Sequence, residues 1–233
     1  MTDKARVTAR TQFADSPMVL RLGAALGAAL TGACGLLGLT VLVLTAGHGS
    51  VLPIDRAAHT WSMHHRPGSL VTVAGVVTAT GTGVFPYAAA VAAGLIAGRD
   101  IRRRLGFALG ALAFLLLGQA LRYGLMEAIG RSRPPVGDWA THASGFAFPS
   151  GHATTSTLMA GLLVAAIGHR ARGSGVGSIA AVLLGCWAAA VGLSRILLGV
   201  HWATDVVAGW LFAACWLGLG AALVRMALPE RPG

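Results

Sequence analysis

Charged residues, and acidic ones above all, are scarce in this sequence. Asp, Glu, Lys and Arg make up 11% of the 233 residues, and only eight residues are acidic. Soluble domains carry about 25% charged residues, so this composition excludes an ordinary soluble domain. With so few carboxylates, a site for two catalytic metal ions is hard to build, and neither a metal nor a cofactor is expected.

Cysteines are almost absent as well. Cys34, Cys186 and Cys215 all lie inside apolar runs, without the spacing of a disulfide framework or a metal site. The formal net charge of +10 comes from short basic clusters between apolar runs. Clusters of that kind flank transmembrane helices, so we expect a lipid bilayer as the partner and no nucleic acid.

Long apolar runs are abundant, and hydrophobic residues make up 55% of the sequence. A helix needs roughly 20 apolar residues to cross a bilayer. Six segments meet this need, at about 20–46, 70–98, 105–130, 153–169, 178–197 and 203–226. They predict an all-α fold, an integral membrane bundle of six transmembrane helices, in one domain over residues 20–226.

The basic residues near the helix ends predict the orientation of the bundle. With six spans, twelve of these Lys and Arg residues share a side with both termini, and five lie opposite. Because basic residues are in excess on the cytoplasmic side, the tails 1–19 and 227–233 are predicted to be cytoplasmic in a multi-pass cell-membrane protein. The loops 47–69, 131–152 and 198–202 then lie on the outer face.

The tetrapeptide Pro-Ser-Gly-His stands at 149–152, at the start of the fourth predicted helix. The first turn of a helix has unpaired N–H groups and a partial positive charge, so it can bind an anion. Ser150 adds a hydroxyl donor, and Gly151 lets a ligand approach the backbone closely. His152 can give or take a proton near neutral pH. The alternative is an ordinary helix cap with an interfacial histidine.

A second set of polar residues lies between 194 and 205. His201 and Asp205 are four residues apart, so a helix would place them on one face, where the carboxylate can orient the imidazole as a nucleophile. The Arg195 guanidinium matches phosphate oxygens. Ser194 is a further donor or only a helix-end residue. The alternative is a buried ion pair that fixes packing, although ionisable residues at membrane depth are functional by default.

Two arginines follow the third predicted helix, which Pro134 and Pro135 bring to an end. Arg133 and Arg131 are further candidates to hold a phosphate, and lipid-headgroup anchoring is the alternative for both. If six spans alternate, this stretch and the two before it meet at one membrane face.

Together the three stretches suit the chemistry of a phosphate ester. Their arginines and helix N–H groups would hold the phosphate charge, which is usually the largest catalytic term. His201, oriented by Asp205, would attack phosphorus. His152 would protonate the leaving oxygen and then activate water.

These stretches resemble the three signature motifs of the type 2 phosphatidic acid phosphatase superfamily of integral membrane lipid phosphatases. The family pattern is a basic residue, six residues and Arg-Pro; then Pro-Ser-Gly-His; then Ser-Arg, five residues, His, three residues and Asp. The matches are at Pro149–His152 and at Ser194, Arg195, His201 and Asp205. The resemblance implies a six-helix core, a metal-independent phosphohistidine mechanism and lipid phosphate substrates.

The first motif departs from the family pattern. Met126 stands seven residues before Arg133, where the family has a basic residue. Arg122, one helical turn earlier on the same face, and Arg131 are the candidates to supply the missing phosphate-binding cation. A protein that binds or transports a lipid phosphate without turnover is therefore an alternative, but the nucleophile, the acid and the orienting carboxylate favour an enzyme.

The lipid end of the substrate is not readable from these motifs. An outward site suits the recycling of a polyprenyl diphosphate carrier such as undecaprenyl diphosphate, which the resembled family includes. Phosphatidic acid and phosphatidylglycerol phosphate are the rival substrates. A phosphotransferase that passes the phosphoryl group to an alcohol would use the same intermediate, and the oligomeric state stays open.

Two further predictions concern packing. The stretch 54–68 is typical of an amphipathic helix at the membrane interface, and a metal site at its histidines is not expected. Glycines at small-xxx-small spacing, Gly23 with Gly27 and Gly106 with Gly110, predict close helix packing.

Overall fold

The computed structural model describes residues 17–46, 51–171 and 174–227, and within these ranges it contains helices and loops but no β-strand. The helices are α2 (Pro17–Thr45), α3 (Pro53–His64), α4 (Gly68–Ala79), α5 (Phe85–Ala97), α6 (Ile101–Ile129), the 3-10 helix η1 (Val136–Asp138), α7 (Gly151–Arg170), α8 (Val176–Leu197) and α9 (Ala203–Ala227). The predicted all-α class is confirmed. Most of the predicted tails, with Lys4, Arg6, Arg10 and Arg231, lies outside the described residues, as does Arg172.

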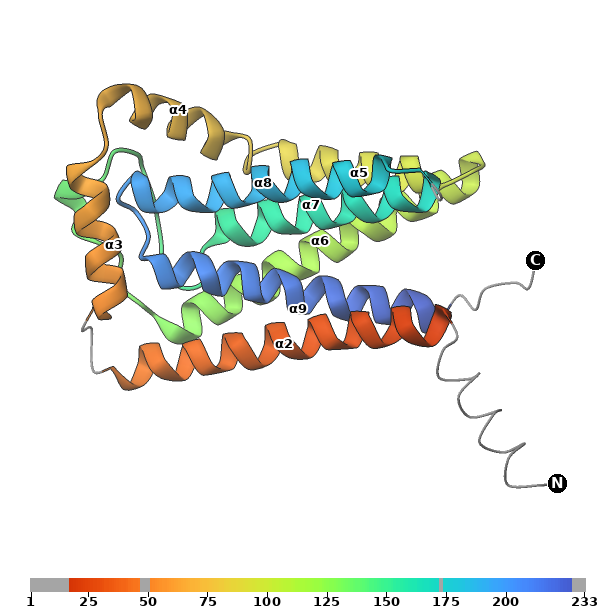
Figure 1. Cartoon of the computed structure of the whole chain (residues 1–233), viewed down its shortest axis with the longest axis horizontal. Coiled ribbons are helices and arrows are strands. Elements are labelled where there is room, and N and C mark those ends of the chain that lie inside the picture. Colours follow the sequence, from red (N-terminus) through yellow and green to blue (C-terminus); the bar gives the residue numbers. More distant parts are fainter. Residues whose placement is uncertain (1–16, 47–50, 172–173, 228–233) are drawn as a thin grey trace.

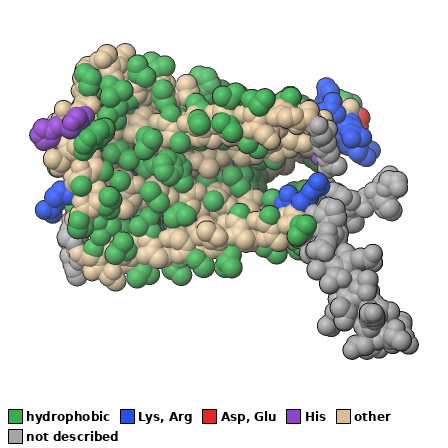
Figure 2. Space-filling model, viewed as in Figure 1, with side chains coloured by type: hydrophobic (Ala, Val, Ile, Leu, Met, Phe, Trp, Pro, Cys, Tyr) green, Lys and Arg blue, Asp and Glu red, His purple; other side chains and the backbone are tan. Residues whose placement is uncertain are grey.

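Five of the described helices, α2, α6, α7, α8 and α9, are long and apolar enough to cross a membrane. Hydrophobic side chains cover the flank of the bundle, whereas Lys, Arg and His side chains gather near its two ends (Figure 2). This distribution is that of a multi-pass membrane protein, because a helix satisfies its own backbone in lipid and keeps charge at the interfaces. Each of the five lies where the sequence predicted a span.

The predicted continuous helix over 70–98 is wrong. The structure ends α4 at Ala79 and begins α5 at Phe85. Gly83, in the connection, has a φ of 64°, in the left-handed region that glycine enters without strain, and Pro86 suits the first turn of a new helix. The two short helices follow one another along the bundle (Figure 1), so together they run its length.

One end of the bundle collects segments that are far apart in the sequence. The described chain enters α2 and leaves α9 at the opposite end, whereas α3 lies across the end that holds the 130–150 loop and the 198–202 turn (Figure 1). We call this the site end. The meeting of the three motif stretches at one end, which the alternation of spans predicted, is confirmed.

Close helix packing does not use the predicted glycines. A Cβ atom on Gly23, Gly27, Gly106 or Gly110 would meet nothing within 4 Å, so these positions face open space and the prediction is wrong. The helices α2 and α9 instead approach each other at Gly218, where a Cβ atom would lie 2.6 Å from the α2 backbone. This tight crossing holds α9, which carries Asp205 of the third motif, against α2.

Candidate active site

His201 and Asp205 form a buried pair at the site end. The His201 Nδ1 atom lies 3.4 Å from the Asp205 Oδ2 atom, and both side chains are buried. The backbone N–H of Trp202 donates to the same carboxylate oxygen at 2.8 Å. His201 lies in the turn between α8 and α9, and Asp205 lies in the first turn of α9. The carboxylate thus holds one imidazole nitrogen and leaves Nε2 free to face the other motifs.

The Nε2 atom of His201 faces Arg133. The Arg133 Nη1 atom lies 2.9 Å from this nitrogen and also donates to the Val200 carbonyl at 2.9 Å. The Nε and Nη2 atoms donate to three carbonyl oxygens in the 144–146 loop. A guanidinium donates and cannot accept, so these bonds assign the proton of His201 to Nδ1 and the lone pair to Nε2.

Burial controls the protonation of this histidine. Removal from water lowers the pKa of His201 to about 4, because it disfavours the imidazolium more strongly than the Asp205 carboxylate favours it. Burial also lowers the pKa of Arg133, and the Asp205 carboxylate opposes that effect. His201 is therefore neutral near pH 7, with the lone pair of its Nε2 atom directed at Arg133.

The start of α7 borders the same site. The Ser150 backbone N–H donates to the Asp205 carbonyl at 2.9 Å, which ties the beginning of α7 to the beginning of α9. The Ser150 Oγ atom is buried without a hydrogen-bond partner. Gly151 and the half-buried His152 form the first turn of α7, where unpaired N–H groups carry partial positive charge.

Near the end of α8, Arg195 supplies a buried guanidinium. Only 2% of this residue is exposed; its Nη1 atom donates to the Thr78 hydroxyl at 2.9 Å, and its Nε atom has no partner. Ser194, by contrast, donates its hydroxyl to the Val191 carbonyl of the same helix at 2.6 Å. That contact favours the helix-end interpretation of Ser194 over a role as a phosphate donor.

The basic groups converge on His152. Its imidazole lies within electrostatic range of four basic side chains, those of Arg122, Arg133, Arg195 and His201. Buried polar atoms are nearly always hydrogen-bonded, so the unpaired Oγ atom of Ser150 and Nε atom of Arg195 are typical of a ligand site. Several positive charges beside a helix N-terminus favour an anion as that ligand.

The two candidates for the missing first-motif cation differ in their surroundings. The Arg122 Nη1 atom lies 3.1 Å from the Met126 Sδ atom, one turn along α6. A Cβ atom on Gly151 would lie 3.5 Å from the Arg122 Cζ atom, so this guanidinium sits beside the start of α7. Arg122 is therefore the candidate that faces the anion-binding terminus.

Arg131 instead lies between two carboxylates. Its Nη1 atom contacts Asp205 Oδ1, and its Nη2 atom lies 2.6 Å from Asp55 Oδ2. These ion pairs occupy the guanidinium, which argues against its use for phosphate. Sequence reasoning missed Asp55, because the stretch 54–68 was interpreted only as an interfacial helix. The scarcity of acidic residues was the signal that could have marked it.

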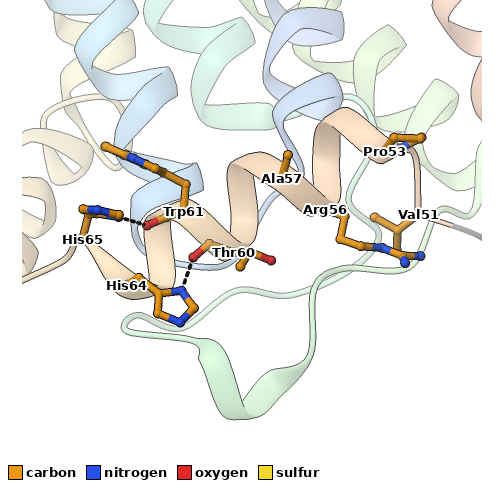
Figure 3. A pocket seen from close by; sticks show the side chains of 8 residues that line it. All are labelled: Val51, Pro53, Arg56, Ala57, Thr60, Trp61, His64 and His65. Carbon is orange, nitrogen blue, oxygen red and sulfur yellow. Dashed lines mark hydrogen bonds between the residues drawn. The ribbon is translucent and has the colours of Figure 1, made fainter.

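The exposed face of α3 carries a groove with a volume of about 700 Å³ (Figure 3). Arg56, Trp61, His64 and His65 are among its lining residues, and none of the lining belongs to the three motifs. Both histidines donate Nδ1 protons to carbonyl oxygens one turn earlier in α3, as the dashed lines show. In the described ranges, no group of three or more His, Cys, Asp or Glu residues could hold a metal ion.

Comparisons with known proteins agree with this geometry. Residues 107–228 match the PAP2 superfamily. The chain is 36% identical over 166 residues to the decaprenylphosphoryl-5-phosphoribose phosphatase of Mycolicibacterium smegmatis, an alignment that covers 70% of this chain and 81% of that protein. The fold is similar to the crystal structure of a transmembrane PAP2 type phosphatidylglycerolphosphate phosphatase from Bacillus subtilis, with a TM-score of 0.76, 24% identity, and coverage of 87% of this chain and 98% of that one.

A helical membrane bundle with a basic, histidine-containing site at one end defines the class of this protein as a membrane enzyme that acts on an anionic group. The chain belongs to the PAP2 superfamily, as the motif resemblance implied. It is a phosphatase of lipid phosphates.

The low pKa of His201 predicts a pH-dependent stability. An unfolded histidine binds its proton near pH 6.5, whereas folded His201 binds one near pH 4, so the unfolded state carries more protons between these values. The free energy of unfolding should therefore fall as the pH falls from about 6.5 to about 4, by up to about 1.4 kcal/mol per pH unit. Thermal unfolding in detergent at pH 7 and pH 4.5 measures this fall.

The matched variant is His201→Asn, whose amide can still donate to Asp205. The loss of thermal stability between pH 7 and pH 4.5 should be smaller in this variant than in the wild type. Equal losses in the two proteins would show that His201 does not titrate as the structure indicates.

Proposed function

We propose that this enzyme removes the terminal phosphate of a lipid through a phosphohistidine on His201. The observation that carries the proposal is the neutral imidazole, with Nδ1 held by Asp205 and the Nε2 lone pair facing the basic cluster. In the first step an Nε2–P bond forms while the bond from phosphorus to the lipid oxygen breaks. The imidazole becomes positively charged, and the Asp205 carboxylate stabilises that charge.

His152 is proposed as the acid and then the base. It stands in the first turn of α7, within electrostatic range of His201. It would give its proton to the leaving lipid oxygen, and then take a proton from the water that attacks phosphorus. The second step breaks the Nε2–P bond, releases inorganic phosphate and restores neutral His201. Acid–base catalysis of this kind contributes about 10²–10⁴-fold to the rate.

Three arginines are proposed to bind the phosphate. Arg133 would transfer its Nη1 contact from His201 to a phosphate oxygen, which also frees the nucleophile. Arg195 would use its unpaired Nε atom, together with the unpaired Ser150 hydroxyl and the N–H of Gly151. Arg122, beside Gly151, would replace the basic residue that the first motif lacks. Ser194 and Arg131 have other partners and receive no phosphate-binding role.

The lipid is proposed to be a polyprenyl-linked sugar phosphate. The M. smegmatis relative, named for decaprenylphosphoryl-5-phosphoribose, supports this choice because it aligns with 70% of the chain. Phosphatidylglycerol phosphate follows, since the similar B. subtilis fold belongs to a phosphatase of that lipid. Polyprenyl diphosphate and phosphatidic acid complete the candidates.

The alternatives of another kind are weaker. Met126, which replaces the basic residue of the first motif, suggested a protein that only binds lipid phosphate. Arg122 supplies a cation beside the N-terminus of α7, so this reason for the alternative is weaker. A phosphotransferase would form the same phosphohistidine and differ in the acceptor, so adding an alcohol and analysing the products separates it from a hydrolase.

Turnover without metal is the first prediction of this mechanism. The purified wild type should release phosphate from decaprenylphosphoryl-5-phosphoribose in the presence of EDTA, because His201 and the arginines supply the nucleophile and the positive charge. His201→Ala should lose at least about 10³-fold in rate, since no other group replaces the nucleophile. Phosphate release is measured over all four candidate lipids, and the covalent phosphohistidine is trapped by an alkaline quench, in which its P–N bond survives. Full activity of His201→Ala would overturn the mechanism.

The role of Arg122 gives a second prediction. Arg122→Met should raise the KM for the lipid phosphate about tenfold or more, because a charge-assisted contact contributes about 1.5–3 kcal/mol. Adding Met126→Lys to this variant places a basic residue where the family pattern has one, and should restore part of the affinity. If Arg122→Met leaves KM and kcat unchanged, Arg122 does not bind the phosphate.

The site end is proposed to face outward, with the termini in the cytoplasm, from the excess of basic residues at the opposite end. The test uses a variant without Cys34, Cys186 and Cys215, into which a single cysteine is introduced. Val136→Cys, exposed in η1, should react with a membrane-impermeant maleimide in intact cells. Arg102→Cys, exposed at the start of α6, should react only after permeabilisation. The reverse pattern would place the active site in the cytoplasm.

A further inference from the structure

A buried acidic residue outside the three motifs contacts the third motif directly. Asp55, in the first turn of α3, is fully buried although it carries a carboxylate. Its Oδ1 atom accepts the backbone N–H of Thr204 at 2.8 Å, and its Oδ2 atom accepts the Thr204 hydroxyl at 2.7 Å. Asp55 therefore caps the N-terminus of α9 from another helix, at the end where a negative charge is stabilised.

Arg131 connects this cap to Asp205. Its Nη2 atom lies 2.6 Å from Asp55 Oδ2, and its Nη1 atom contacts Asp205 Oδ1 and donates to the Thr204 hydroxyl at 2.7 Å. The planar guanidinium holds its donors in a fixed geometry, so the two carboxylates are held at a fixed separation. Arg131 comes from the end of α6, Asp55 from α3 and Asp205 from α9, so the contact joins three elements.

The two oxygens of Asp205 have separate partners. Oδ1 faces Arg131, whereas Oδ2 accepts the Trp202 N–H and faces His201 Nδ1. A partial rotation of the carboxylate would misalign both oxygens and break the contact with the imidazole. Arg131 opposes that rotation, and Arg131 is in turn anchored by Asp55. Breaking any of these ion pairs would leave a buried charge without a partner, which costs free energy, so the three side chains are held in one arrangement.

The helix α3 also contacts the residues before and after His201 in the turn between α8 and α9, and the short helix η1. His59 Nε2 lies 3.0 Å from Asp138 Oδ2 in η1, and the His59 ring packs edge-on against Trp202. The Ser62 hydroxyl donates to the Ile196 carbonyl at the end of α8 at 3.1 Å. These contacts hold the whole of α3 in place, so Asp55 keeps a constant position relative to Asp205.

We propose that Asp55 and Arg131 are positioning residues of the reaction, which act by orienting Asp205 and through it His201. Neither touches the phosphate. The proposal rests on the proposed role of His201 as nucleophile. It gives α3 an indirect part in the reaction, through the orientation of His201, in addition to any contact with the membrane surface.

The central experiment separates the rate at each site from the number of sites. Asp55→Asn keeps the shape of the side chain but removes the charge that anchors Arg131. With decaprenylphosphoryl-5-phosphoribose and EDTA, kcat should fall about 10²-fold, as expected for a misplacement of about 1 Å, while KM changes less than about twofold. In single turnovers with the enzyme in excess, stopped by alkaline quench, the rate constant of phosphoryl transfer should fall by a similar factor.

Asp138→Asn is the matched control, because it removes the charge of another acidic side chain bound to α3, while its amide oxygen can still accept the hydrogen bond from His59 and α3 stays in place. Its kcat should stay within about twofold of the wild type. Thr204→Val gives a second variant that removes only the hydroxyl between Asp55 and Arg131, and kcat should fall several-fold. If the two residues act in series, the Asp55→Asn, Arg131→Met double variant should be no slower than Arg131→Met alone.

The outcomes distinguish this proposal from the proposed function. A wild type that forms no phosphohistidine would overturn the mechanism itself. A wild type that forms it, with kcat of Asp55→Asn and Thr204→Val within about twofold, would overturn the positioning role alone. An unchanged single-turnover rate constant, with activity lost in proportion to the fraction of unfolded chains, would make Asp55 a folding residue and also overturn that role.

Discussion

The candidate active site depends on how the Asp205 carboxylate is held away from water. Burying a carboxylate costs several kcal/mol unless ion pairs and hydrogen bonds compensate. Here one oxygen contacts Arg131, and the other accepts the Trp202 N–H and faces His201. These partners come from the end of α6 and from the turn before α9, while the Asp205 carbonyl accepts the Ser150 N–H at the start of α7. The contacts that compensate one buried charge therefore also fix the three motif stretches relative to one another.

Arg133 faces the other ring nitrogen of His201, and within the described residues no carboxylate forms an ion pair with it. Arg133 lies within electrostatic range of both Arg122 and Arg195, and like charges in a water-poor site repel each other. Hydrogen bonds from Arg133 to the carbonyl oxygens of the 144–146 loop offset part of this repulsion. A phosphate dianion would offset the rest. Neighbouring like charges thus favour a doubly charged ligand, and in the proposed mechanism they favour the transition state of phosphoryl transfer still more.

Much of the fold and most of the site could be predicted from the sequence. Apolar runs gave the five long helices because lipid imposes length and composition on a span. They failed over 70–98, because a turn at Gly83 leaves the composition apolar while it breaks the helix. The spacing of His201 and Asp205 anticipated their contact, since it depends on local geometry. The spacing of Arg122 and Arg131 could not show which of them faces the predicted phosphate site, because their partners come from other helices, α7 and α3.

The family match begins at residue 107, inside α6, and therefore leaves out α3. Residues that touch the phosphate must keep both type and spacing, so a motif describes them. A carboxylate that only anchors Arg131 needs to reach one guanidinium and one helix N-terminus, and an acidic residue at several positions of a crossing helix could do so. Asp55 meets this need from the first turn of α3, outside the three motifs. In the proposed mechanism, a helix whose sequence is typical of the membrane surface thus carries a positioning residue. Its buried carboxylate is the feature that a purely interfacial helix does not require.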